Sequence, residues 1–112
     1  WVAGFSFGSW VAMHLLMRRP EINGFVCVSP PANIRDFNFL APCPSSGLIV
    51  HGDKDNVASF DSARILSEKL QKQKKAEIIF KSIKGADHFY ENHKLEFSSI
   101  VDEYIKKRLN DS

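Results

Sequence analysis

Short unbroken apolar runs alternate with helix-like stretches along this chain, and this alternation constrains the fold more than any other feature. Each apolar run has the length and pattern of a strand buried on both faces of a sheet. The runs are Trp1 to Phe5, Gly24 to Val28, Gly47 to His51 and Glu77 to Ile83. The stretches predicted to be helical are Phe7 to Arg19, Ser59 to about Lys72 and His93 to Leu109. Such an order predicts an α/β fold with a four-stranded, mostly parallel sheet flanked by helices, in a single domain over residues 1–112.

The composition excludes several classes of function. Fifteen basic and 13 acidic residues give a net charge of +2, which favours neither a nucleic acid nor an anionic membrane as partner. Cys27 and Cys43 lie far apart and lack metal-binding spacing, so we expect neither a disulfide nor a metal site, and a reducing, cytoplasmic setting. No apolar run approaches the roughly 20 residues that span a bilayer.

A serine stands between two glycines at the point where the first strand meets the first helix. The motif is Gly4-Phe5-Ser6-Phe7-Gly8, which matches G-x-S-x-G. In such a turn the serine is held in a strained conformation with its hydroxyl exposed, and the glycines remove side chains that would collide. The following helix directs its free N–H groups toward the same point. The alternative is a tight turn that needs small residues and has no chemistry.

A serine nucleophile needs a base, and the chain offers four histidines. His88 follows the last strand, at the carboxyl end where parallel sheets place their sites, so we expect it to be the base. His14 lies within the first helix and is read as a packing residue. His93 opens the last helix and is read as solvated, and His51 is read as a side chain that stabilises a loop.

The base in turn needs a carboxylate to orient it. Asp55 follows the third strand and lies far enough out to reach across to the next loop, so we favour it. Asp53 competes, but it is better placed to bond the N–H groups of its own turn. Asp36, in the long loop after the second strand, is the outside candidate. Asp87 adjoins His88 and is expected to point away from the imidazole.

Together these segments resemble the motifs of the α/β-hydrolases. The elbow Gly4 to Gly8, the acid loop His51 to Asp55 and the loop Gly85 to Phe89 come in the family's order of nucleophile, acid and base. More narrowly, the chain is similar to the C-terminal half of small bacterial dienelactone-hydrolase and serine-aminopeptidase-like enzymes. The resemblance covers nearly the whole chain, and the three motifs together are far more specific than any one of them.

The resemblance implies a serine hydrolase that cleaves a carboxylic ester or small amide without a cofactor. Ser6 would attack the carbonyl, His88 would take its proton and Asp55 would fix the imidazole tautomer. The Phe7 N–H would supply one oxyanion donor. Transfer of the acyl group to an alcohol instead of water would use the same residues.

The family's sheet has more strands than the four found here, so the first strand should be left as an exposed apolar edge. We therefore expect a fragment whose edge pairs with a missing N-terminal half or with a second copy of the chain. The alternative function is an inactive fragment or interaction module that pairs through this edge. Three loop aromatics either line an acyl pocket or simply cap the sheet, namely Phe37, Phe39 and Phe89.

Overall fold

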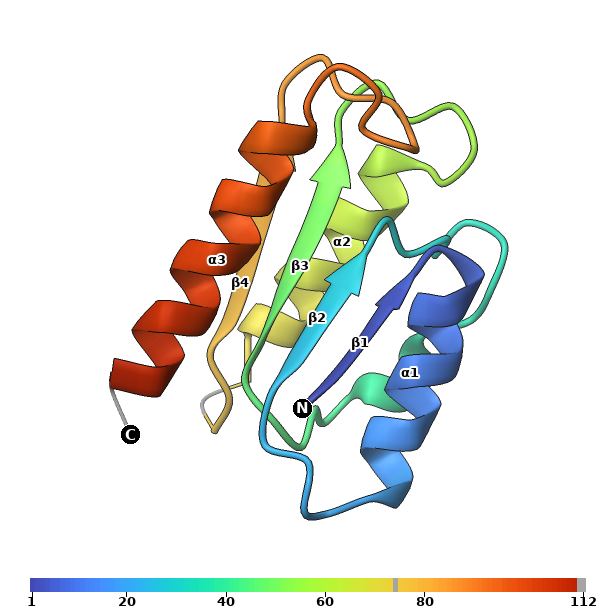
Figure 1. The fold of residues 1–112 in the computed structure, drawn as a ribbon. Helices are drawn as coiled ribbons and strands as arrows, with labels where there is room; N and C mark the ends of the chain where they lie inside the picture. The colour runs from blue at the N-terminus through green and yellow to red at the C-terminus, as the bar shows by residue number, and fades with distance from the viewer. Residues whose placement is uncertain (74, 111–112) are drawn as a thin grey trace.

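The computed structural model describes residues 1–73 and 75–110, which form four strands and three α-helices (Figure 1). The strands are β1 (Val2–Phe5), β2 (Phe25–Val28), β3 (Gly47–Gly52) and β4 (Ile78–Ile83). The helices are α1 (Phe7–Arg18), α2 (Phe60–Gln71) and α3 (Lys94–Asn110), with a short 3-10 helix η1 (Asn38–Leu40) before β3. Each predicted strand and helix is present, with ends that agree or differ by one residue.

The sheet is parallel throughout, with its strands side by side in chain order β1-β2-β3-β4 (Figure 1). Alternate residues of β2 show which helices cover which face. Phe25 and Cys27 pack in one apolar cluster with α1 and α2, whereas Val26 and Val28 pack in another with α3. Because the strands are parallel, all four end at the same edge of the sheet. The loops that carry the candidate site residues meet at this edge.

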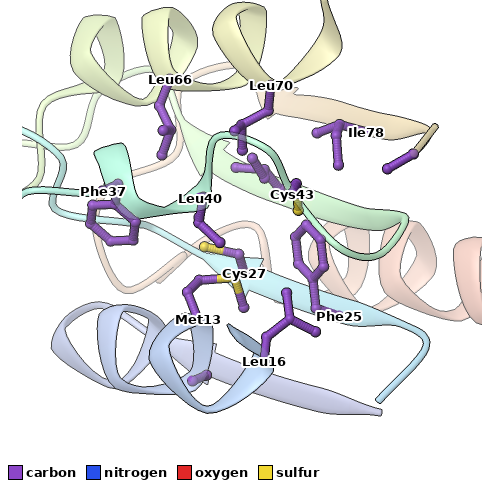
Figure 2. Close-up of a cluster of buried hydrophobic side chains, with 13 residues drawn as sticks. Met13, Leu16, Phe25, Cys27, Phe37, Leu40, Cys43, Leu66, Leu70 and Ile78 are labelled. Atoms are coloured by element: carbon purple, nitrogen blue, oxygen red, sulfur yellow. The ribbon is translucent and has the colours of Figure 1, made fainter. Parts of the chain in front are cut away.

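The larger cluster lies between the sheet and the two helices α1 and α2 (Figure 2). Met13 and Leu16 enter it from α1, and Leu66 and Leu70 enter it from α2. Phe37 is only 3% exposed and belongs to this cluster, so it packs in the core. The long loop after β2 thus closes the core by folding its aromatic residues inward.

Helix α2 begins where the sequence predicts it. The Ser59 hydroxyl accepts a hydrogen bond from the Ser62 N–H at 3.2 Å, and Asp61 lies in the first turn, where a negative charge complements the helix dipole.

No helix in residues 1–73 or 75–110 is long and apolar enough to cross a membrane.

Strand β1 lies at one edge of the sheet, and within residues 1–73 and 75–110 no strand pairs with its outer edge (Figure 1). Phe5 in this strand is 41% exposed. Beside it, α1 buries one face and leaves the opposite face open, with Val11 50% and Leu15 42% exposed. Exposed apolar side chains are therefore present both on the open edge strand and on the helix that follows it.

Candidate active site

Ser6 occupies a sharp turn between β1 and α1. Its φ is 56° and its ψ is −123°, a conformation that L residues rarely adopt, and its N–H donates to the Val28 carbonyl at 2.8 Å. A Cβ on Gly4 would lie 2.7 Å from the Ser9 Cα and would collide with the Gly8 carbonyl. Gly4 is therefore required for the close approach of strand and helix.

Gly8 does not share this requirement. A Cβ built there meets no atom of the described residues within 4 Å, so the prediction that both glycines relieve collisions is wrong for Gly8. Its position is the second of α1, which most side chains can occupy.

Three side chains from separate loops meet above the carboxyl ends of the strands. The Ser6 Oγ lies 2.9 Å from His88 Nε2, and His88 Nδ1 lies 2.7 Å from Asp55 Oδ2. These residues follow β1, β4 and β3 respectively. The result is a continuous chain of hydroxyl, imidazole and carboxylate within hydrogen-bonding distance.

The Asp55 carboxylate is held by its own loop as well as by the imidazole. Its Oδ1 accepts hydrogen bonds from the Val57 and Ala58 N–H groups, each at 2.8 Å, and its side chain is fully buried. Oδ2 is thus left to face His88. A buried carboxylate bonded in this way is held in a fixed orientation.

The loops after β3 and β4 are joined by hydrogen bonds. The Lys54 N–H donates to the Ala86 carbonyl at 3.0 Å, and Asp53 Oδ1 accepts from the Gly85 N–H at 2.7 Å. The prediction that Asp53 bonds its own turn is therefore wrong, because its carboxylate binds the neighbouring loop. Gly52 permits this approach, since a Cβ there would lie 2.9 Å from the Ala86 Cβ.

His51, at the end of β3, is fully buried below the acid loop. Its Nε2 lies 2.8 Å from the Ala58 carbonyl, which agrees with the prediction of a loop-stabilising role. The same nitrogen lies 3.3 Å from Asp55 Oδ2. Burial lowers the pKa of His51 and outweighs the Ala58 carbonyl and the Asp55 carboxylate, which raise it, while His88 lowers it further.

The remaining candidates lie outside this arrangement. His14 is half-buried on α1 and stacks on the Phe39 ring at 3.8 Å between centroids. Asp36 Oδ1 accepts from the Asn38 N–H, and Asp87 Oδ1 accepts from the Glu91 N–H.

His93 directly precedes α3 and is only partly exposed to solvent. It is half-buried, and its carbonyl accepts a hydrogen bond from the Phe97 N–H at 3.0 Å.

Among residues 1–73 and 75–110, no three His, Cys, Asp or Glu side chains are grouped so that they could hold a metal ion.

A buried pair that sequence reasoning missed supports the loop of His88. The Tyr90 hydroxyl lies 2.7 Å from the Ser29 Oγ and donates to the Val50 carbonyl at 3.3 Å. Both residues have positive φ, 57° for Tyr90 and 51° for Ser29, and burial is the main cause that raises the pKa of Tyr90 to about 12. In the sequence, Ser29-Pro30 marks the end of a strand. Nothing in the sequence indicates that Ser29 contacts Tyr90, which lies 61 positions later.

Two aromatic rings pack against the imidazole of His88. The ring of Phe5 lies 5.1 Å from that of His88, and the ring of Phe89 lies 5.0 Å from it. Phe89 is 60% exposed, so it does not cap the sheet. Phe7, also in the elbow, has the Arg35 guanidinium over its ring, 4.9 Å from the ring centroid.

Known proteins resemble the chain in both sequence and structure. The model of the dienelactone hydrolase family matches residues 1–111. An uncharacterized protein of Rickettsia prowazekii is 47% identical over 108 residues, which are 93% of this chain and 45% of that protein. A protein of unknown function from Agrobacterium tumefaciens, assigned to the α/β hydrolases, is 49% identical with a TM-score of 0.97, covering all of this chain and 51% of that one.

More distant structures share the fold. An α/β serine hydrolase homologue from Coxiella burnetii is 28% identical with a TM-score of 0.73, over 88% of this chain and 45% of that chain. The architecture is therefore that of the α/β hydrolases, as the motifs predicted. This chain spans about half the length of the relatives it matches.

Proposed function

The chain belongs to the dienelactone hydrolase family, and we propose that it carries the nucleophile, base and acid of a serine hydrolase acting on a carboxylic ester or a small amide. One observation supports this above all others. Ser6, His88 and Asp55 form an unbroken hydroxyl–imidazole–carboxylate chain, although they come from three separate loops. A cytoplasmic setting is part of the proposal, because Cys27 and Cys43 are buried free thiols.

In the proposed reaction, the Ser6 Oγ forms a bond to the substrate carbonyl carbon while its proton passes to His88 Nε2. The carbonyl electron pair moves to oxygen, and its return expels the alcohol or amine, which takes the proton from His88. Water then attacks the acyl-enzyme with His88 again acting as base, which releases the carboxylic acid and restores the Ser6 hydroxyl. Asp55 accepts from Nδ1–H throughout, so Nε2 is the nitrogen free to accept the serine proton.

The developing oxyanion needs donors, and we assign one to the Phe7 N–H. Phe7 is the first residue of α1, where an N–H has no acceptor within the helix and the helix dipole favours negative charge. Loss of a single oxyanion donor costs about 10²–10³ in rate. We therefore expect the reaction of a chain with this donor alone to be slower, by about 10²–10³, than that of a chain with a second donor.

A fluorophosphonate probe tests the assignment, because it labels a serine only when that serine is activated. We expect mass spectrometry to find one label on wild type, on Ser6, and none on Ser6→Ala or His88→Gln. Ser98→Ala is the matched control, since Ser98 is exposed on α3 and distant in sequence from the elbow. A folded wild-type chain that takes no label, or a Ser6→Ala variant that labels equally, would contradict the proposal.

The open edge of β1 favours a second candidate function, which is association through this edge. A parallel strand with one unpaired side exposes backbone N–H and C=O groups that another strand can pair with. Phe5 in β1 and two side chains of the following helix α1, Val11 and Leu15, are exposed apolar residues. Because the relatives are about twice as long, we propose that the occupant is a polypeptide equivalent to the part of them that this chain does not match.

Co-expression tests this second candidate. The partner is the part of the Agrobacterium tumefaciens protein that lies outside the match, and the expected result is a heterodimer on gel filtration. The double substitution Val11→Lys with Leu15→Lys should weaken this heterodimer. The control Glu68→Lys should not weaken it, because Glu68 lies on the exposed side of α2. A homodimer that excludes this partner, or a chain that stays monomeric beside it, would contradict the assignment.

A further inference from the structure

His51 is a buried polar side chain that the proposed reaction does not use. It is 0% exposed, and its position at the end of β3 places its ring below the acid loop. Its Nε2 faces two oxygens, the Ala58 carbonyl at 2.8 Å and Asp55 Oδ2 at 3.3 Å. The ring of Phe60 packs edge-on against it at 6.0 Å.

The surroundings of the two ring nitrogens determine which one carries the proton. Nε2 lies between two acceptors, so a bare lone pair there would be repelled by both oxygens, and a proton there is attracted to both. Nδ1 is buried without a hydrogen-bond partner among the described residues. A proton on Nδ1 would therefore be an unsatisfied buried donor. These surroundings favour a neutral His51 with its proton on Nε2.

A packing role alone does not account for this side chain. An unpaired polar atom buried away from water costs about 1–3 kcal/mol. Leucine or methionine would fill similar space without an unpaired Nδ1. What the imidazole supplies, and leucine and methionine lack, is an N–H that points into the acid loop.

We propose that His51 is a positioning residue for the acid, and that its Nε2–H holds Asp55 and Ala58 together so that the carboxylate faces His88. Ala58 is bound at both ends, because its N–H donates to Asp55 Oδ1 while its carbonyl accepts from His51. Oδ2 in turn faces both His51 Nε2 and His88 Nδ1. The role in reactivity rests on the proposed function, whereas the effect on the geometry of Asp55 does not.

Two substitutions separate the N–H donor from the volume of the ring. In His51→Gln the side-chain amide can place an N–H close to the position of Nε2. In His51→Leu the side-chain volume is kept and the N–H donor is lost. If the leucine variant does not fold, His51→Met is used in its place. His14→Leu is the matched control, because His14 stacks on Phe39, away from the acid loop.

The first readout is the rate of fluorophosphonate labelling. A small misplacement of a catalytic group costs up to about 10²-fold in rate. We expect His51→Leu to slow labelling by at least about tenfold, whereas His51→Gln and His14→Leu should stay within about threefold of wild type. Equal labelling of His51→Leu and wild type, with both folded, would overturn the proposal, and so would failure of His51→Gln to exceed His51→Leu.

The second readout does not depend on catalysis. The His88 Nδ1–H proton, assigned by its absence in His88→Gln, should give a downfield nuclear magnetic resonance signal in wild type and in His51→Gln. In His51→Leu it should move upfield or be lost by exchange with water. If wild type takes no label, the proposed function fails and this signal alone decides the role of His51. An unchanged signal in His51→Leu would then refute that role.

Discussion

His88 Nδ1 lies 2.7 Å from Asp55 Oδ2, although 33 residues separate the two in the chain. The carboxylate can only accept, so it keeps the proton on Nδ1 and leaves Nε2 free to face the Ser6 hydroxyl. An amide in the same place could present its own N–H to Nδ1 and stabilise the opposite tautomer.

Asp55→Asn is therefore expected to lower the labelling rate, and the hydrolysis rate of an activated ester, by about 10⁴-fold while the chain stays folded. Asp53→Asn is the matched control, because the same change at Asp53 keeps an oxygen that can accept from the Gly85 N–H. Rates that fall equally in the two variants would contradict the assignment of Asp55.

The two glycines of the elbow should respond oppositely to alanine. Gly4→Ala forces a methyl group against Gly8 and Ser9, and overpacking of this kind costs about 1–3 kcal/mol of unfolding free energy. Gly8→Ala places its methyl group in open space among the described residues and removes a glycine from α1, so we expect no loss and a gain of up to about 1 kcal/mol. Urea unfolding of both variants measures the difference. A Gly8→Ala variant as unstable as Gly4→Ala would contradict it.

Tyr90→Phe should destabilise the chain by about 1–3 kcal/mol, because it leaves the buried Ser29 hydroxyl without its partner. Ser29→Ala alone should also destabilise it. The double variant should cost less than the sum of the two, since each change removes the same contact. A double-mutant cycle in urea provides the measurement, and strict additivity would show that the pair is not coupled.

His51 should make the chain less stable in mild acid. Its pKa is lowered in the folded chain by burial, whereas in the unfolded chain the pKa of a histidine is near its ordinary value of about 6.5. Below that pH the unfolded chain binds a proton that the folded chain does not. Stability attributable to His51 is therefore lost as the pH falls below about 6.5, by up to about 1.4 kcal/mol per pH unit.

Urea unfolding at several pH values between 8 and about 5 checks this expectation. Other titrating groups are shared by wild type and His51→Gln, so the difference between their slopes isolates His51. The glutamine variant should lose less stability as the pH falls. Parallel slopes would show that His51 is protonated in the folded chain or that its proton is not linked to folding.

The sequence predicted the positions of the strands and helices because each has a local signal. Ser59 is a cap with Asp61 in the first turn, and β2 is an unbroken apolar run. The meeting of Ser6, Asp55 and His88 was also predictable, because parallel strands deliver their following loops to one edge of the sheet.

Contacts that depend on the exact path of a loop were not predictable. Asp53 bonds Gly85 because the end of β3 comes close to the loop after β4, which no spacing reveals. The contact of His51 with Asp55 requires the 55–58 turn to fold back, and the Asp55 side chain itself makes that turn. Phe37 could not be assigned to the core from composition alone, because burial of a loop aromatic is decided by tertiary packing.

Ser6 and His88 are separated by 82 positions, and strands β2 and β3 lie between the strands that precede them. No partly assembled sheet can therefore hold the serine beside the imidazole. Reactivity toward the probe should disappear over the same urea range as the far-ultraviolet circular dichroism, so that a single covalent label would report cooperative assembly of the whole sheet.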